Sequence, residues 1–140
     1  MMTTQSAVMG RQGGHDPLSL RAVLAIDAGT CLAMGLLLVA AAAPLAGLLG
    51  LPEPLLFWAG MLLFPCAALM AGTAAMRPPP AALAWLVIAG NAAWVLASVG
   101  VLLVTAPNFL GTAFVLAQAA VVLVLLVVER RGLRDLISAS

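Results

Sequence analysis

The chain has 140 residues, of which 64% are hydrophobic and only 8% are charged, with a formal net charge of +1. This composition excludes an ordinary soluble domain, and the lack of a basic run with interleaved aromatic residues excludes a nucleic-acid partner. We therefore expect a single-domain integral membrane protein of the all-α class, with the lipid bilayer as its surroundings.

The first twenty residues show no apolar periodicity. They contain Gly13, Gly14, His15 and the Asp16-Pro17 pair among polar residues and methionines. Such a segment cannot bury enough apolar surface to fold alone. We predict a flexible cytoplasmic tail over residues 1–20, in which His15 is solvated.

Four apolar segments follow, each long enough to cross a hydrocarbon core, which takes about 20 helical residues. Prolines separate them, because proline lacks the amide donor that continues a helix. The apolar stretch 45–51 is too short to span; we predict an interfacial turn, with an extension of the first helix as the alternative. The predicted transmembrane domain covers 21–128, with spans at 22–43, 55–76, 81–104 and 109–128.

The first span has a competing interpretation as a cleaved signal peptide. Leu36 to Val39 form an apolar core, and the alanines that follow offer small-residue cleavage sites. The long leader, the interrupting Asp27 and the position of Pro44 fit such a signal poorly. A retained helix is favoured.

A short polar segment, 129–140, ends the chain. Its charges alternate with Leu133, Leu136 and Ile137. This pattern predicts a cytoplasmic tail that lies as an amphipathic segment on the anionic inner leaflet.

All cationic side chains are arginines, and they fall before the first span, between the second and third, and after the fourth. The two other turns carry none. By the positive-inside rule, this distribution predicts that both termini are cytoplasmic, in a bacterial inner membrane.

Similar placement of Asp27 before Pro44 and of Asn91 before Pro107 raises the alternative of a duplicated bundle. Its halves would be two parallel helical hairpins, as in some small transporters. Chance similarity in an Ala/Leu-rich sequence is the favoured explanation of the match.

Polar residues inside the spans are the candidate site, because they are costly in hydrocarbon and tend to face the bundle interior. Asp27 lies about 9 Å along the helix from Arg21, within reach of Arg77. We expect an Asp27–Arg77 ion pair that joins the first two spans, with a proton or substrate site at Asp27 as the alternative.

Asn91 and Gln118 both fall near mid-bilayer, at about 15 Å depth. They are predicted to hydrogen-bond to each other and so set helix rotation. Trp94 follows Asn91 on the same helical face and is expected to pack in the core. The alternative is a polar patch in a small ligand cavity formed by Asn91, Trp94 and Gln118.

No cluster of residues indicates catalysis. Cys31 and Cys66 lie at mid-membrane depth and are expected to be reduced, and the lone His15 offers no metal cluster. We expect no catalytic, cofactor-binding or metal site, and therefore no enzyme.

Four segments resemble a group of small four-helix bacterial inner-membrane proteins of uncharacterised function: Ala25–Gly29, Gly50–Pro52, Gly90–Val95 and Gly111–Gln118. The resemblance covers the spans but neither tail, and it implies no activity, substrate or cofactor. It implies that four positions merit testing: Asp27, Asn91, Trp94 and Gln118.

The sequence thus favours a non-enzymatic structural or accessory subunit, which packs with itself or within a larger membrane complex. The alternative is a small-molecule or proton-coupled carrier that uses Asp27 and the Asn91/Trp94/Gln118 region. A cavity reaching Asp27 would favour the carrier, and a close-packed interior would favour the structural role.

Overall fold

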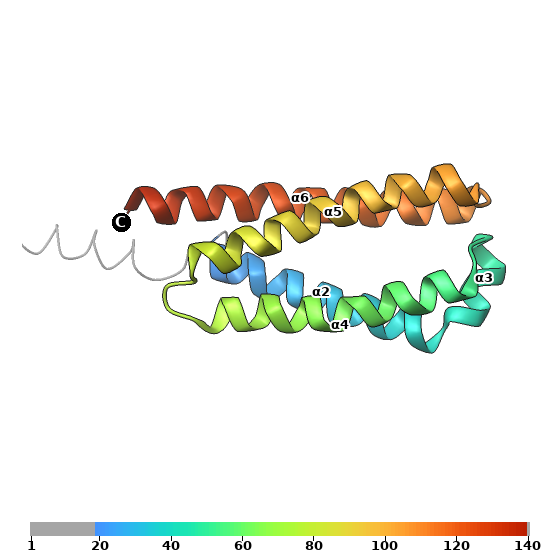
Figure 1. Cartoon of the computed structure of the whole chain (residues 1–140), viewed down its shortest axis with the longest axis horizontal. Helices are drawn as coiled ribbons and strands as arrows, with labels where there is room; N and C mark the ends of the chain where they lie inside the picture. The colour runs from blue at the N-terminus through green and yellow to red at the C-terminus, as the bar shows by residue number, and fades with distance from the viewer. Residues whose placement is uncertain (1–18, 140) are drawn as a thin grey trace, which may run out of the picture.

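The computed structural model describes residues 19–139, which fold entirely into helices and turns (Figure 1). The predicted tail over residues 1–20 therefore lies outside the described residues, apart from its last two positions. Within the described part there are five helices: α2 (Leu20–Ala40), α3 (Ala42–Leu49), α4 (Glu53–Ala75), α5 (Ala81–Thr105) and α6 (Phe109–Ala139).

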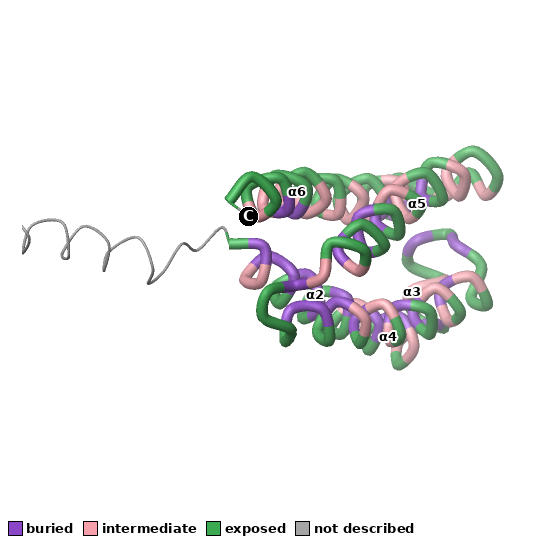
Figure 2. Tube along the Cα trace, turned by 60° about the vertical axis from the view of Figure 1, so that its left-hand side comes forward, coloured by how far each residue is buried: buried purple, intermediate pink, exposed green. Residues whose placement is uncertain are grey.

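Four of these helices, α2, α4, α5 and α6, are long and apolar enough to span a membrane, with mean hydropathies between 1.9 and 2.5 over their most apolar stretches. Their outward sides carry exposed positions along the full length of the bundle (Figure 2). Side chains such as Leu103, Val104 and Phe109 are 80 to 85% exposed, which is favourable only in lipid. The all-α, multi-pass membrane architecture is confirmed.

Helix α2 begins at Leu20, where the Ser19 hydroxyl accepts a hydrogen bond from the backbone N–H of Ala22. Such a cap satisfies one of the free amides at a helix start. The helix ends at Ala40, before the expected residue 43, and the stretch predicted as a turn is the short helix α3. Pro44 lies in the first turn of α3, where a missing amide costs nothing.

The end of the chain differs most from expectation. The helix that holds the last span does not stop at residue 128; α6 continues as one helix to Ala139. Glu129 and Leu133 lie one turn apart on the same face, and both are 0% exposed. Residues 129–139 therefore continue α6, with one face packed on the core and Arg130, Arg131 and Arg134 exposed; their predicted location on the inner leaflet stays a prediction.

The helices pair as two hairpins, α2 with α4 and α5 with α6, which lie against each other (Figure 1). The start of α2, the α4–α5 turn and the end of α6 lie at one end of the bundle, which we call the terminal end. Helix α3 and the α5–α6 turn lie at the other, the α3 end. Whether the two hairpins are an internal duplication stays a prediction.

Asn108 joins α3 to the start of α6. Its side-chain N–H donates to the carbonyl of Leu48 at 3.0 Å, and its side-chain oxygen accepts from the amide of Gly111 at 2.8 Å. A Cβ added to Gly111 would overlap the carbonyl oxygen of Leu49 and come 2.8 Å from the Pro107 Cβ. The α3 end is therefore closed by backbone contact that only glycine permits.

We expect Gly111→Ala to lower the free energy of unfolding by about 1 to 3 kcal/mol, because the new methyl group forces α3 away from α6. Thermal unfolding in detergent measures the change. Gly72→Ala is the matched control, since a Cβ there meets nothing within 4 Å. Equal stability of the two variants would contradict the proposed contact.

Candidate functional site

Three polar side chains from three helices meet in the interior: Asp27 of α2, Asn91 of α5 and Glu129 of α6, here called the acidic cluster. The Asn91 Nδ2 donates to Asp27 Oδ2 at 2.8 Å and to Glu129 Oε2 at 2.9 Å. All three are buried, at 1%, 5% and 0% exposure. One amide group therefore holds two carboxyl groups next to each other, away from solvent.

One polar atom of the acidic cluster has no hydrogen-bond partner. Among the described residues, Glu129 Oε1 is the one buried side-chain oxygen or nitrogen without a hydrogen-bond partner. An unpaired polar atom in such surroundings costs several kcal/mol, and more when it carries charge. The cluster has room for one more donor, and the smallest donor is a proton on the carboxyl group itself.

The sulfur atoms beside the cluster are reduced. The Cys31 thiol donates weakly to Asp27 Oδ1 at 3.7 Å, and its sulfur lies 3.8 Å from the Met70 Sδ. Cys31 and Cys66 are both free. Over residues 19–139, no group of three His, Cys, Asp or Glu side chains is arranged to hold a metal ion.

A second polar group, the amide cluster, lies nearer the α3 end and consists of Trp94, Ser98 and Gln118. The Trp94 indole N–H donates to Gln118 Oε1 at 2.7 Å, while Gln118 Nε2 donates to the Ser98 hydroxyl at 2.9 Å and to the Val115 carbonyl at 3.1 Å. The Ser98 hydroxyl in turn donates to the Trp94 carbonyl at 2.8 Å. These contacts tie α5 to α6 without any charge.

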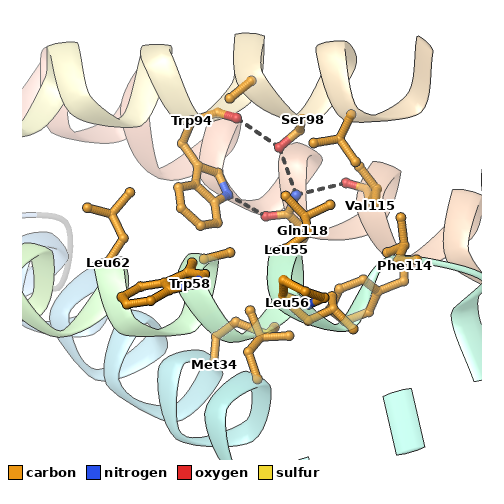
Figure 3. A pocket seen from close by; sticks show the side chains of 16 residues that line it. Met34, Leu55, Leu56, Trp58, Leu62, Trp94, Ser98, Phe114, Val115 and Gln118 are labelled. Atoms are coloured by element: carbon orange, nitrogen blue, oxygen red, sulfur yellow. Dashed lines mark hydrogen bonds between the residues drawn. The ribbon is translucent and has the colours of Figure 1, made fainter. Parts of the chain in front are cut away.

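The amide cluster borders a cavity of about 500 Å³ between the two hairpins (Figure 3). Trp58 and Leu62 of α4 face it from one side, and Phe114 of α6 from another. The remaining walls come from α2, α5 and the loop before α4. This volume falls in the range of small-molecule sites.

A smaller cavity of about 140 Å³ extends toward the terminal end and is lined by Asp27, Thr30 and Cys31. It shares Met34, Trp94 and Gln118 with the large cavity. The two cavities therefore border the same side chains, with the large cavity nearer the α3 end and the small cavity beside the acidic cluster.

The predicted Asp27–Arg77 contact is replaced by another. Asp27 bonds Asn91 and Cys31, whereas Arg77 is exposed in the turn after α4 has ended. The arginine of α2 that contacts a neighbouring helix is Arg21. Its Nε–H donates to the Ala74 carbonyl oxygen of α4 at 2.8 Å. Helical phase explains the change, since Asp27 faces α5 and α6 rather than the turn.

The predicted Asn91–Gln118 hydrogen bond is also replaced. Asn91 bonds the two carboxyl groups, and Gln118 bonds Trp94 and Ser98. Trp94 is thus part of a hydrogen-bonded group as well as a packing residue. The three residues expected to form one polar patch lie in two clusters: Asn91 in the acidic cluster, and Trp94 and Gln118 in the amide cluster.

Sequence reasoning missed Glu129 and Ser98. Glu129 directly precedes two arginines and was placed beyond the last span, although its spacing of four from Leu133 on one helical face was visible. Ser98 lies four residues after Trp94 and seven after Asn91, on the same face of α5. That spacing is the signal that connects it to the site.

No family model, curated protein or solved structure matches this chain. The comparisons therefore identify no family and assign no role to any residue. Function is therefore inferred from the geometry of the two clusters and of the cavities that their residues line.

We expect Asn91→Leu to destabilise the protein by about 1 to 3 kcal/mol, because both carboxyl groups lose their donor while staying buried. Unfolding in mixed micelles measures this. The triple variant Asp27→Leu/Asn91→Leu/Glu129→Leu should recover most of the loss, since no buried charge is left. Glu53→Gln, at an exposed position, serves as the control. An Asn91→Leu protein as stable as that control would contradict the role of the amide.

Proposed function

We propose that this protein is a non-enzymatic, proton-coupled membrane carrier for a small molecule. The observation that carries the proposal is the unpartnered Glu129 Oε1, buried in the same cluster as Asp27, which lines the small cavity. A proton-coupled carrier needs a group that gains and loses a proton inside the membrane, and intramembrane carboxyl groups commonly serve this purpose.

The chemistry of the acidic cluster fits reversible proton binding. The Asn91 Nδ2 has two hydrogens, and both are used, one for each carboxyl group. A proton on Glu129 would remove one of two like charges and turn Oε1 into a donor. Loss of that proton restores the repulsion between Asp27 and Glu129. The protonated cluster therefore holds α2, α5 and α6 together more strongly than the deprotonated one.

The arrangement of the helices supports a route for this change. Contacts within each hairpin are more extensive than contacts between the hairpins, and α5 contacts α4 only sparsely. The two hairpins can therefore rock as units, a motion by which transporters expose a central site alternately to each side. The cavity lies between them, where such rocking would open or close it.

The accessory-subunit role that composition favoured stays a prediction. The apolar outer faces suit lipid as well as another subunit, whether a second copy or a member of a larger complex. Affinity isolation from native membranes in mild detergent tests it: a stoichiometric partner of different sequence would support the accessory role and count against an autonomous carrier.

We expect the carboxyl C=O infrared band of a protonated Glu129 to be present in wild type and absent in Glu129→Gln. On transfer from H₂O to D₂O, this band should shift within about seconds, because the domain motions that expose a carrier's site take roughly microseconds to seconds. Infrared difference spectroscopy on reconstituted protein measures both the band and the shift.

Glu53→Gln is the matched control for this experiment, since Glu53 is exposed at the start of α4 and lies outside the cluster. It should leave the band intact. A buried carboxyl band that never exchanges would indicate a locked structural contact and overturn the carrier. Absence of any band unique to Glu129 would do the same.

We further propose that the protein sits in a bacterial cytoplasmic membrane with both termini in the cytoplasm. The described arginines all lie toward the terminal end of the bundle (Figure 1), as the positive-inside rule requires of the cytoplasmic side. They are Arg21, Arg77, Arg130, Arg131 and Arg134.

A green fluorescent protein fused after Ser140 should therefore fluoresce, and alkaline phosphatase at the same place should be inactive. Insertion of each reporter in the α5–α6 turn should give the opposite result. The reverse pattern would show that the arginines do not determine orientation here.

A further inference from the structure

We infer that the large cavity binds an uncharged, mostly hydrocarbon molecule with one hydroxyl or N–H group. As the carried molecule, this ligand rests on the proposed carrier function; as a bound molecule, it rests on the cavity alone. Three features support this inference: the lining of the cavity, the unused hydrogen-bonding capacity of the amide cluster and the position of the opening.

The lining excludes a charged ligand. The described residues around the cavity include no Asp, Glu, Lys or Arg, and almost all of its wall is apolar. A carboxylate or ammonium group would lose its hydration there without a partner of opposite charge, which costs several kcal/mol. Hydrocarbon, in contrast, gains contact with Leu55, Trp58 and Phe114.

The amide cluster specifies the polar end of the ligand. Both Gln118 Nε2 hydrogens are used, toward Ser98 and Val115, and the Ser98 and Trp94 hydrogens are also donated within the cluster. The Gln118 Oε1 accepts one hydrogen bond, from Trp94, and an amide oxygen can accept two. The cluster can therefore accept a hydrogen bond from a ligand but offers no free donor. A hydroxyl or N–H group is matched, and a bare carbonyl is not.

The rim indicates where such a molecule comes from. Trp58 is 67% exposed and Leu62 is 56% exposed, and both line the cavity from α4. Both residues lie on the outer side of α4, a helix long and apolar enough to span the membrane. A ligand dissolved in the membrane can reach the cavity sideways without crossing water.

Tryptophan fluorescence tests the ligand class directly. Trp58 and Trp94 line the cavity and Trp85 does not, so in Trp85→Phe protein in lipid nanodiscs the saturable part of the quenching reports on the site, while the lipid-exposed face of Trp58 adds a part that rises linearly. The probes are ω-bromoundecanol, bromoundecane and ω-bromoundecanoate, since bromine quenches tryptophan on contact. We expect saturable quenching by the alcohol, at an affinity about tenfold higher than for the other two, which is the effect of one hydrogen bond.

Three variants make the outcome specific. Gln118→Leu should abolish the preference for the alcohol over bromoundecane. Ala59→Phe fills the cavity and should abolish saturable quenching, whereas Ala117→Phe, on an exposed face of α6 outside the cavity lining, should leave it unchanged. Equal affinity for all three probes, or tighter binding of the carboxylate, would overturn the inference. So would quenching that only rises linearly with probe concentration.

The ligand and the carrier can fail separately. If the alcohol binds as expected but the Glu129 carboxyl never exchanges with D₂O, the cavity is a binding site and the carrier proposal falls. If the carboxyl exchanges and the alcohol does not bind, the inference about the ligand falls and proton binding stands.

Discussion

Within a bilayer core, no water satisfies a polar group, so each one must find its partner in the protein. This constraint fixes the arrangement of the bundle. Asn91 can satisfy Asp27 and Glu129 together only if α2, α5 and α6 turn these residues toward a common point. Apolar packing tolerates many helix rotations, whereas this contact accepts one. The hydrophobic composition places the chain in the membrane, and three polar side chains determine which faces of the helices are inside.

The sequence predicts the spans well and their contacts poorly, for one physical reason. Span length and proline breaks are local properties, so α2, α4 and α5 begin and end within three residues of expectation. Partners depend on helix rotation, which an almost uniformly apolar helix does not reveal. Depth in the membrane alone therefore predicts Arg77 as the ion-pair partner of Asp27. Glu129 was missed because the arginines after it mark the membrane boundary by charge, while the helix itself continues.

The two polar clusters divide the interior by chemistry. Toward the terminal end, carboxyl groups can change charge; toward the α3 end, amide, hydroxyl and indole groups cannot. Met34, Trp94 and Gln118 line both cavities. A shift of these side chains at one cavity would therefore alter the wall of the other. Coupling between a proton and a ligand requires only that each favours a different packing of the same two hairpins. The large cavity between the hairpins would differ in shape between two such packings.

Helix α6 has 31 residues and is therefore about 46 Å long, well beyond the roughly 30 Å of a hydrocarbon core. Its last turns, with Arg130, Arg131 and Arg134, extend into the headgroup region as a rigid continuation of the rod that holds Glu129. Because Glu129 directly precedes Arg130, a tilt of α6 moves the buried carboxyl group and the arginines together. In the proposed orientation, anionic headgroups beside these arginines would act on the tilt of α6 and, through it, on the acidic cluster.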